Sequence, residues 1–148
     1  APEGVDVRPW PFTKTVGEGF YLLPEGRGAL LASSMDQTPS PPCDAAAEEL
    51  DIAIAADRVE RATTLAIRRI AHSWAGLRSF APDELPVVGE AAGAPGFFWC
   101  AGQGGAGFQT APALSRIAAA AVLGEAMPED CAAAGLGFAQ FAPARLGA

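Results

Sequence analysis

The sequence predicts an α+β fold, and three features of it carry that prediction. Short apolar runs separated by glycine and proline turns near its beginning are typical of antiparallel strands. A longer alanine-rich stretch, in which Leu50, Ile54 and Val59 form one loose apolar stripe, predicts a helix. Further along, an apolar strand leads into a glycine-rich turn and then a second helix, over Phe97 to Gly124.

The first expected elements are a hairpin, a loop and a helix. Pro9 to Leu31 alternates apolar groups with glycine and proline, which predicts a hairpin whose turn spans Pro24 to Gly28. Ser33 to Pro42 is polar and proline-rich, which indicates a loop. Asp44 is a candidate N-cap, and the carboxylates after it suit the positive end of a helix over about residues 44–60.

Two extended segments are expected after that helix. Thr63 to Ile70 alternates β-branched or apolar residues with small or basic ones, the pattern of a half-buried strand. Ser73 to Phe80 predicts a second extended segment, in which Arg78 has mainly apolar neighbours.

The strand, turn and helix that follow form the best-defined unit. Phe97 to Ala101 is apolar at every position, as in a strand buried on both faces within a sheet. Gly102 to Gly107 is the turn. Thr110 is expected to cap the next helix, with Pro112 in its first turn and Gly124 closing it.

Charge and composition exclude several classes of protein. A net charge of -7 argues against a nucleic-acid partner. No apolar stretch approaches the roughly 20 residues of a membrane span. Cys43, Cys100 and Cys131 are too few and too scattered for a disulfide framework, so we expect buried or half-buried reduced thiols in a cytoplasmic protein. His72, the single histidine, has no metal-ligand spacing around it and is expected to be structural.

The glycine turn is the first candidate binding feature. Gly102, Gly104 and Gly107 satisfy G-x-G-x-x-G between a strand and a helix. No second strand follows, as a first dinucleotide-binding unit requires, so this unit closes a sheet. Small residues still let backbone N–H groups approach a ligand, and the helix dipole favours an anion there. The alternative is a tight turn that needs glycine only for its backbone angles.

Arg78 and Tyr21 are the second candidate feature. A guanidinium among apolar neighbours needs a carboxylate partner, which either a substrate or an internal Asp or Glu would supply. Tyr21 is the only tyrosine. Its hydroxyl would complete a carboxylate site, or its ring would simply pack at the edge of the core.

Several blocks of this sequence resemble, in order and spacing, the C-terminal portion of the FAD-dependent D-amino-acid oxidase / glycine oxidase family, and within it the bacterial D-arginine dehydrogenases. The likeness covers nearly the whole chain. The most specific blocks are Ser-Trp-Ala-Gly-Leu-Arg-Ser-Phe and Gln-Gly-Gly-Ala-Gly-Phe-Gln-Thr. The blocks span Gly19 to Leu22, Ala62 to Arg69, Ser73 to Phe80, Pro82 to Gly89, Gly96 to Ala101 and Gly102 to Gln109.

The resemblance implies an incomplete fold in three parts. Residues 1–80 would form an antiparallel substrate-domain sheet with a helix. Residues 81–126 would supply the final strand-helix unit of a Rossmann-like FAD domain, and residues 127–148 a loosely attached tail. The partner implied is a missing N-terminal FAD-binding region, and we expect the isolated chain to be inactive or free of FAD.

The resemblance also implies roles for single residues. Arg78 matches the arginine that pairs with the substrate α-carboxylate, and Tyr21 matches the tyrosine whose hydroxyl joins it. Gly105 falls where a main-chain carbonyl contacts the substrate amino group. No side chain is assigned as catalytic. The residues that match the turn against the flavin of FAD are Gly104, Gly105, Ala106, Gly107, Phe108 and Gln109.

The activity implied is oxidation of an amino acid, a D-amino acid or a glycine-type substrate, to its imino acid by hydride transfer to flavin N5. A competing hypothesis is a free-standing, non-enzymatic α+β module. Such a module would use the glycine turn and Arg78 to bind a carboxylate metabolite or a partner chain.

Overall fold

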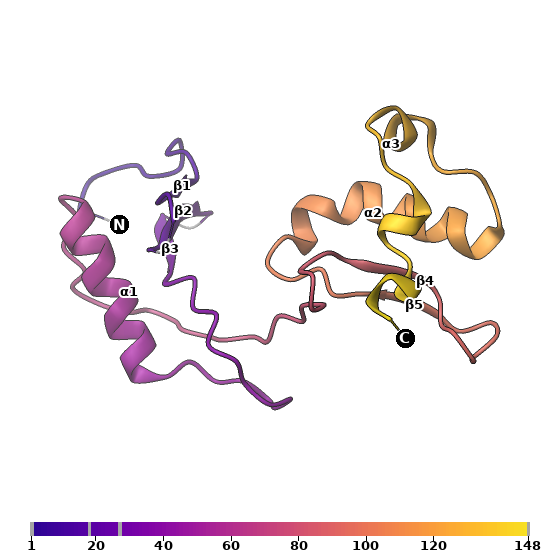
Figure 1. The fold of residues 1–148 in the computed structure, drawn as a ribbon. Helices are drawn as coiled ribbons and strands as arrows, with labels where there is room; N and C mark the ends of the chain where they lie inside the picture. The colour runs from indigo at the N-terminus through magenta and orange to yellow at the C-terminus, as the bar shows by residue number, and fades with distance from the viewer. Residues whose placement is uncertain (1, 18, 27, 148) are drawn as a thin grey trace. The chain divides into compact units, whose positions relative to one another are not determined.

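A computed structural model describes residues 2–17, 19–26 and 28–147 of the chain (Figure 1). The chain divides into two compact units, Ala1–Leu77 and Arg78–Ala148. Each unit contains a small antiparallel sheet and at least one helix, so the predicted α+β class is confirmed.

The sheet of the first unit has the strand order β1-β2-β3. These strands are β1 (Thr13–Lys14), β2 (Tyr21–Glu25) and β3 (Ala29–Ser33), and both pairings are antiparallel. The β2–β3 hairpin is the predicted one, but its turn is shorter than the predicted Pro24 to Gly28, because Pro24 and Glu25 belong to β2 and pair with Leu30 and Ala29. Residue 27 of the turn lies outside the described residues. Gly28 closes the turn at φ +79°, a backbone angle that favours glycine, and its N–H donates to the Glu25 oxygen at 3.1 Å.

Helix α1 (Glu49–Ala62) packs against β3 (Figure 1). The Arg58 side chain ties the helix to the sheet, because its Nη1 donates to the backbone oxygens of Gly19 and Ser34, both at 2.8 Å. The buried core of this unit is formed by Phe20, Leu22 and Val59, with Leu30, Leu65 and Ile67 packed on it.

The predicted start of α1 is wrong. Asp44 is not its N-cap, since the helix begins at Glu49 and Glu48 occupies the cap position without a side-chain cap bond. Leu50, which we expected in the apolar stripe, is largely exposed. An additional turn at residues 44–48 would therefore gain little packing, and packing is what stabilises most short helices.

The strand predicted over Thr63 to Ile70 does not form a ladder with any described residue. Its alternation is nevertheless present, because Leu65 and Ile67 face the core while Thr64 and Ala66 are exposed. Side-chain oxygens, and not the backbone of a neighbouring strand, accept hydrogen bonds from backbone N–H groups of this segment. Leu65 N donates to Thr63 Oγ1 at 3.1 Å, and Ile67 N donates to Glu60 Oε1 at 2.6 Å.

The second unit contains a β-hairpin covered by a helix. Strands β4 (Val87–Glu90) and β5 (Phe98–Ala101) pair antiparallel, with Val87 opposite Ala101 and Glu90 opposite Phe98. Helix α2 (Gly107–Leu123) packs on β4 (Figure 1). Gly124 ends α2 as predicted, in the left-handed conformation with its N–H donating to the Ala120 oxygen.

The predicted start of α2 needs correction. The helix begins at Gly107 with Ala106 as its N-cap, so Thr110 lies within the helix and Pro112 lies beyond the first turn. The Thr110 hydroxyl donates back to the Ala106 oxygen at 3.0 Å instead of capping an N–H group.

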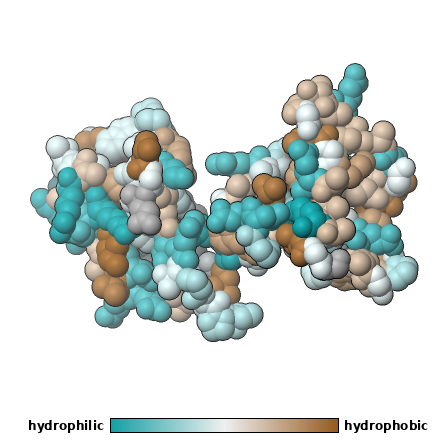
Figure 2. Space-filling view, viewed as in Figure 1, coloured by the Kyte–Doolittle hydropathy of each residue, from teal (hydrophilic) through white to brown (hydrophobic). Residues whose placement is uncertain are grey.

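Strand β5 is not buried on both faces, contrary to the prediction. It pairs with β4, and within the described part of the chain no strand pairs with its other edge. Trp99 is 44% exposed and Cys100 is also exposed. Apolar and polar residues both reach the surface of each unit on the face seen in Figure 2.

The residues after α2 are not a loose tail. They form α3 (Glu129–Ala133) and two 3₁₀ turns, η1 (Phe138–Gln140) and η2 (Pro143–Leu146). Apolar residues of this segment pack against a buried cluster of α2, β4 and α3, and this packing holds the segment in place. The buried cluster consists of Val88, Leu114, Ile117 and Cys131, and the residues packed on it include Met127, Leu136, Phe138 and Phe141.

The cysteines differ from expectation in burial. Cys131 is buried as predicted, whereas Cys43 and Cys100 are exposed, and all three are free thiols. Among the described helices, none combines the length and apolar character needed to cross a bilayer.

Replacement of Ile117 by Ala tests the core of the second unit. Ile117 is 1% exposed at the centre of the cluster, so we expect a loss of about 2–5 kcal/mol in unfolding free energy. Urea unfolding followed by far-UV circular dichroism measures it. Val122→Ala is the matched control on the same helix, because Val122 is 55% exposed and its truncation leaves no cavity. Equal losses for the two variants would contradict this packing.

Candidate functional site

The glycine turn between β5 and α2 is the centre of the candidate site. Gly102 and Gly104 have φ angles of +71° and +53°, so both need the left-handed conformation that glycine adopts without strain. Gly104 N donates to the Ser79 oxygen at 3.0 Å, and Phe80 and Gln103 form an antiparallel bridge. The segment that carries Arg78 therefore runs along the glycine turn.

The turn approaches two side chains of that segment closely. A Cβ added to Gly104 would lie 2.5 Å from Cε1 of Phe80, and one added to Gly105 would lie 3.1 Å from Nη1 of Arg78. The Arg78 guanidinium also lies near the Phe80 ring, with Cζ 5.9 Å from its centroid. Glycine at these positions leaves room for the guanidinium to lie against the main chain of the turn.

Arg78 is exposed, so the burial expected from its apolar neighbours is wrong. Ser73 to Phe80 forms no strand beyond the single bridge at Phe80, and the side chains at residues 73–80 are all exposed. An exposed guanidinium does not carry the cost of a buried charge, so this position needs no buried carboxylate beside it.

Two positive features meet at the turn. Helix α2 begins at Gly107, and the first N–H groups of a helix have no acceptor within it and carry the positive end of its dipole. The first turn of α2 contains no acidic residue that would compensate this end. Because the Arg78 guanidinium lies beside Gly105, close to this helix start, the site is suited to a carboxylate or another small anion.

Phe80 and Gln103 are contact residues that the sequence analysis missed. Phe80 holds its ring beside the guanidinium, and Gln103 Nε2 donates to the Cys100 oxygen at 3.2 Å. The spacing of Arg78 and Phe80 could have predicted that their side chains lie together, because residues i and i+2 of an extended chain lie on the same face.

Tyr21 belongs to the other unit. It lies on β2, half-buried, with its ring centroid 5.5 Å from that of Phe12. The structure describes the surroundings of Tyr21 and of Arg78 separately, so their joint role stays a prediction. His72 stacks on Trp74, with ring centroids 5.5 Å apart. No group of three potential metal ligands occurs among the described residues.

Two ion pairs determine the main electrostatic shifts in the second unit. Arg145 hydrogen-bonds both carboxylate oxygens of Asp83, which lowers the pKa of this carboxyl below its ordinary value near 3.8. Arg116 does the same to Asp130, and it lowers that pKa also. Both carboxylates therefore stay ionised to lower pH than they would in the unfolded chain.

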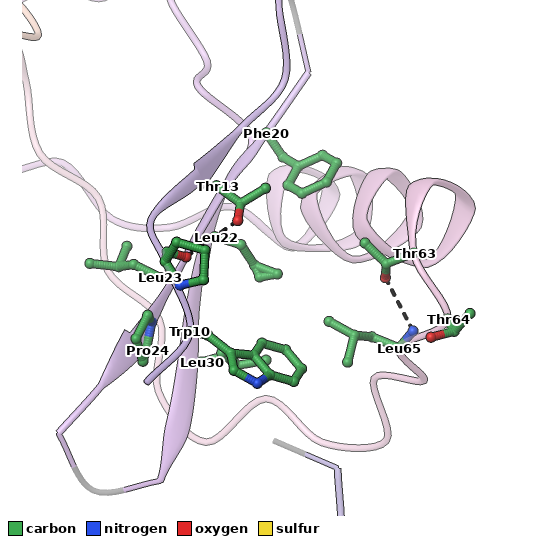
Figure 3. Close-up of a pocket in the computed structure, with 11 residues that line it drawn as sticks. Trp10, Thr13, Phe20, Leu22, Leu23, Pro24, Leu30, Thr63, Thr64 and Leu65 are labelled. Atoms are coloured by element: carbon green, nitrogen blue, oxygen red, sulfur yellow. Dashed lines mark hydrogen bonds between the residues drawn. The ribbon is translucent and has the colours of Figure 1, made fainter. Parts of the chain in front are cut away.

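An apolar pocket of about 170 Å³ lies in the first unit, between the hairpin and the segment after α1 (Figure 3). Trp10, Leu30 and Leu65 are among the side chains drawn around it, and the Thr63 hydroxyl accepts a hydrogen bond from Leu65 N. None of its lining residues is ionisable. The pocket is suited to an apolar group, and neither Tyr21, Arg78 nor Gly105 lines it.

Comparison with known proteins identifies the family to which this chain belongs. The family model DAO, described as FAD dependent oxidoreductase, matches residues 1–121. The chain therefore belongs to this family of FAD-dependent oxidoreductases, and FAD is the family's cofactor.

A similar individual protein is the "tRNA 5-methylaminomethyl-2-thiouridine biosynthesis bifunctional protein MnmC" of Verminephrobacter eiseniae (strain EF01-2). It is 40% identical to this chain over 84 residues, which are 55% of this chain and 13% of that protein. The chain thus matches a small part of a much longer relative.

The residues at the turn fit an FAD-binding role. Gly104 and Gly105 have no side chains, and the N-terminus of α2 follows them. An anion or the electron-rich edge of a ring can therefore approach the main-chain N–H donors there. Phe108, on the first turn of α2, is 101% exposed, so an apolar surface also adjoins the turn.

Replacement of Gly104 by Ala is expected to destabilise the second unit by about 1–2 kcal/mol, because alanine is strained at a positive φ. The new methyl group would also meet the Phe80 ring. Gly105→Ala is the matched control, since Gly105 has no positive φ and the nearest atom is the mobile end of Arg78. Urea unfolding compares the two, and an equal or larger loss for Gly105→Ala would contradict the turn geometry.

The ion pair of Asp83 predicts an acid-sensitive stability. Because its pKa is lower in the folded than in the unfolded chain, the stabilisation is complete above the unfolded value near 3.8 and is lost as pH falls through the folded value. Unfolding free energy measured in urea between about pH 6 and pH 2 should fall less steeply in Asp83→Asn. The exposed Asp44, which forms no ion pair with another described residue, provides the control Asp44→Asn. An unchanged slope in Asp83→Asn would refute the assignment.

Proposed function

We propose that this chain supplies the carboxylate-binding and flavin-edge part of an FAD-dependent enzyme that oxidises an amino acid, a D-amino acid or a glycine-type substrate, to its imino acid. The observation that carries the proposal is the position of the Arg78 guanidinium beside Gly105 at the start of α2. The similarity of the blocks around Arg78 to bacterial D-arginine dehydrogenases supports the amino-acid substrate.

Arg78 binds the substrate carboxylate in this proposal. A guanidinium offers two parallel N–H donors to a carboxylate, which fixes both the position and the orientation of the acid. The Phe80 ring beside the guanidinium limits where the Arg78 side chain lies. The Gly105 carbonyl accepts a hydrogen bond from the substrate amino group.

The glycine turn holds the cofactor edge. Backbone from Gly104 to Gln109 and the positive end of α2 would hold the pyrimidine edge of bound flavin and favour negative charge there. The chemistry that bound FAD supplies is acceptance of the hydride from the substrate Cα. Arg78 and Gly105 hold the acid and the amine so that Cα faces the ring, and the released imino acid hydrolyses to a 2-oxo acid and ammonia.

The two units divide this work. Residues 1–80 form part of the substrate-binding domain, and residues 81–126 return to the FAD-binding domain of a longer enzyme. Residues 127–148 would follow the FAD-domain part as a segment that packs on α2 and β4. The division of the chain at Leu77 and Arg78 into two compact units supports this arrangement.

Substitution of Arg78 tests the proposal in the full-length product of the encoding gene, purified with FAD. Glycine and a panel of D- and L-amino acids are assayed with an artificial electron-accepting dye. We expect Arg78→Ala to lower kcat/KM roughly 100-fold, chiefly through KM, and Arg78→Lys to lower it less, since lysine keeps the charge but loses the paired donors.

Arg69→Ala is the control for charge, because Arg69 is exposed and has no part in the proposed site. An equal effect of Arg69→Ala and Arg78→Ala, or oxidation of no amino acid in the panel, would refute the proposed role. If the purified full-length protein shows no flavin absorbance at about 450 nm, the non-enzymatic carboxylate-binding module is favoured instead.

The similarity to the MnmC protein favours a second candidate substrate, an amine carried on a tRNA uridine. The net charge of -7 argues against this candidate, because an acidic chain offers little electrostatic attraction to the phosphates of a tRNA. Nucleoside analysis of tRNA incubated with the full-length protein separates the two, since only this second candidate predicts an altered uridine.

A further inference from the structure

Arg145 makes an unusually complete set of contacts for a residue outside the part matched by the family model, residues 1–121. Its side chain is 13% exposed. Nε donates to Asp83 Oδ2 at 2.7 Å, and Nη2 donates to Asp83 Oδ1 at 3.1 Å and to the Leu85 oxygen at 2.8 Å. Nη1 donates to the Phe141 oxygen at 2.7 Å. One side chain thus joins η2 to the turn at residues 81–85.

That turn adjoins the glycine turn of the candidate site. A Cβ at Gly102 would lie 3.5 Å from Ala81 N and 3.7 Å from the Leu85 oxygen, the same oxygen that accepts from Arg145. Glu84, in the middle of the turn, has a φ of +61°, an angle that a non-glycine residue adopts only under constraint. Its N–H donates to the Ala81 oxygen at 2.9 Å.

The segment around Arg145 also holds β4. The Phe141 oxygen accepts from Val88 N at 2.9 Å as well as from Arg145. Pro143 lies close to Gly89, where an added Cβ would be 3.0 Å from Pro143 Cδ. The last residues of the described chain therefore contact both the strand β4 and the turn that precedes it.

We infer that Arg145 is a positioning residue for the candidate site. By fixing the turn at residues 81–85 against β4, it holds Phe80 and Arg78 in register with the glycine turn. The route is short, because Ser79 and Phe80 bond directly to Gly104 and Gln103. The effect on geometry is independent of any ligand, while its consequence for catalysis rests on the function proposed above.

Amide hydrogen exchange of the 148-residue chain without FAD or substrate tests this inference. In Arg145→Gln, exchange of peptides covering residues 79–85 and 102–106 should rise about tenfold or more, whereas α1 stays unchanged. Arg145→Lys should restore part of the protection, because lysine keeps the charge but reaches fewer acceptors. Asp83→Asn should loosen the same peptides, and it serves if Arg145→Gln does not fold.

Arg116→Gln is the matched control. Arg116 forms a similar two-bond pair with Asp130, at 2.9 and 2.6 Å, but it joins α2 to α3. It should increase exchange around residues 129–133 and leave the glycine turn protected. The inference is overturned if Arg145→Gln loosens only residues 141–147, or if it raises exchange uniformly across the second unit. Either result leaves the role of Arg78 in carboxylate binding untouched.

Discussion

The hydrogen bond from the Gly104 amide to the Ser79 oxygen is the contact on which the candidate site depends. It joins a segment with almost no regular structure to the turn between β5 and α2. Because of this bond and the neighbouring bridge at Phe80 and Gln103, Arg78 lies beside Gly105 at a helix start. Without that contact, the guanidinium and the helix dipole would be two unrelated positive features.

Local patterns predicted the elements whose formation depends on nearby residues. The β2–β3 hairpin and the Gly124 end of α2 follow from glycine conformations and short-range hydrogen bonds, and the structure has both. The strand predicted at Thr63 to Ile70 shows where this reasoning stops. Its alternation of buried and exposed residues is real, but pairing depends on a partner strand that periodicity does not reveal.

The site was predictable in part for the same reason. Glycine spacing indicated a turn that brings main chain close to another group, and the structure shows Phe80 and Arg78 in the space that side chains would fill. The exposure of Arg78 was not predictable, because apolar neighbours in sequence do not have to pack around it. The contacts of Arg145 could not be predicted from local sequence, since its partners Asp83 and Leu85 lie about sixty residues away.

The absence of acidic residues from the first turn of α2 affects which solutes can reach the glycine turn. The chain as a whole is strongly acidic, so a multiply charged anion is repelled while it is still several ångströms away. A zwitterion has no net charge and meets no such barrier. Once within a few ångströms, its negative end experiences the local field of Arg78 and α2. At a ligand site on this turn, long-range repulsion combined with short-range attraction would therefore favour zwitterions over polyanions.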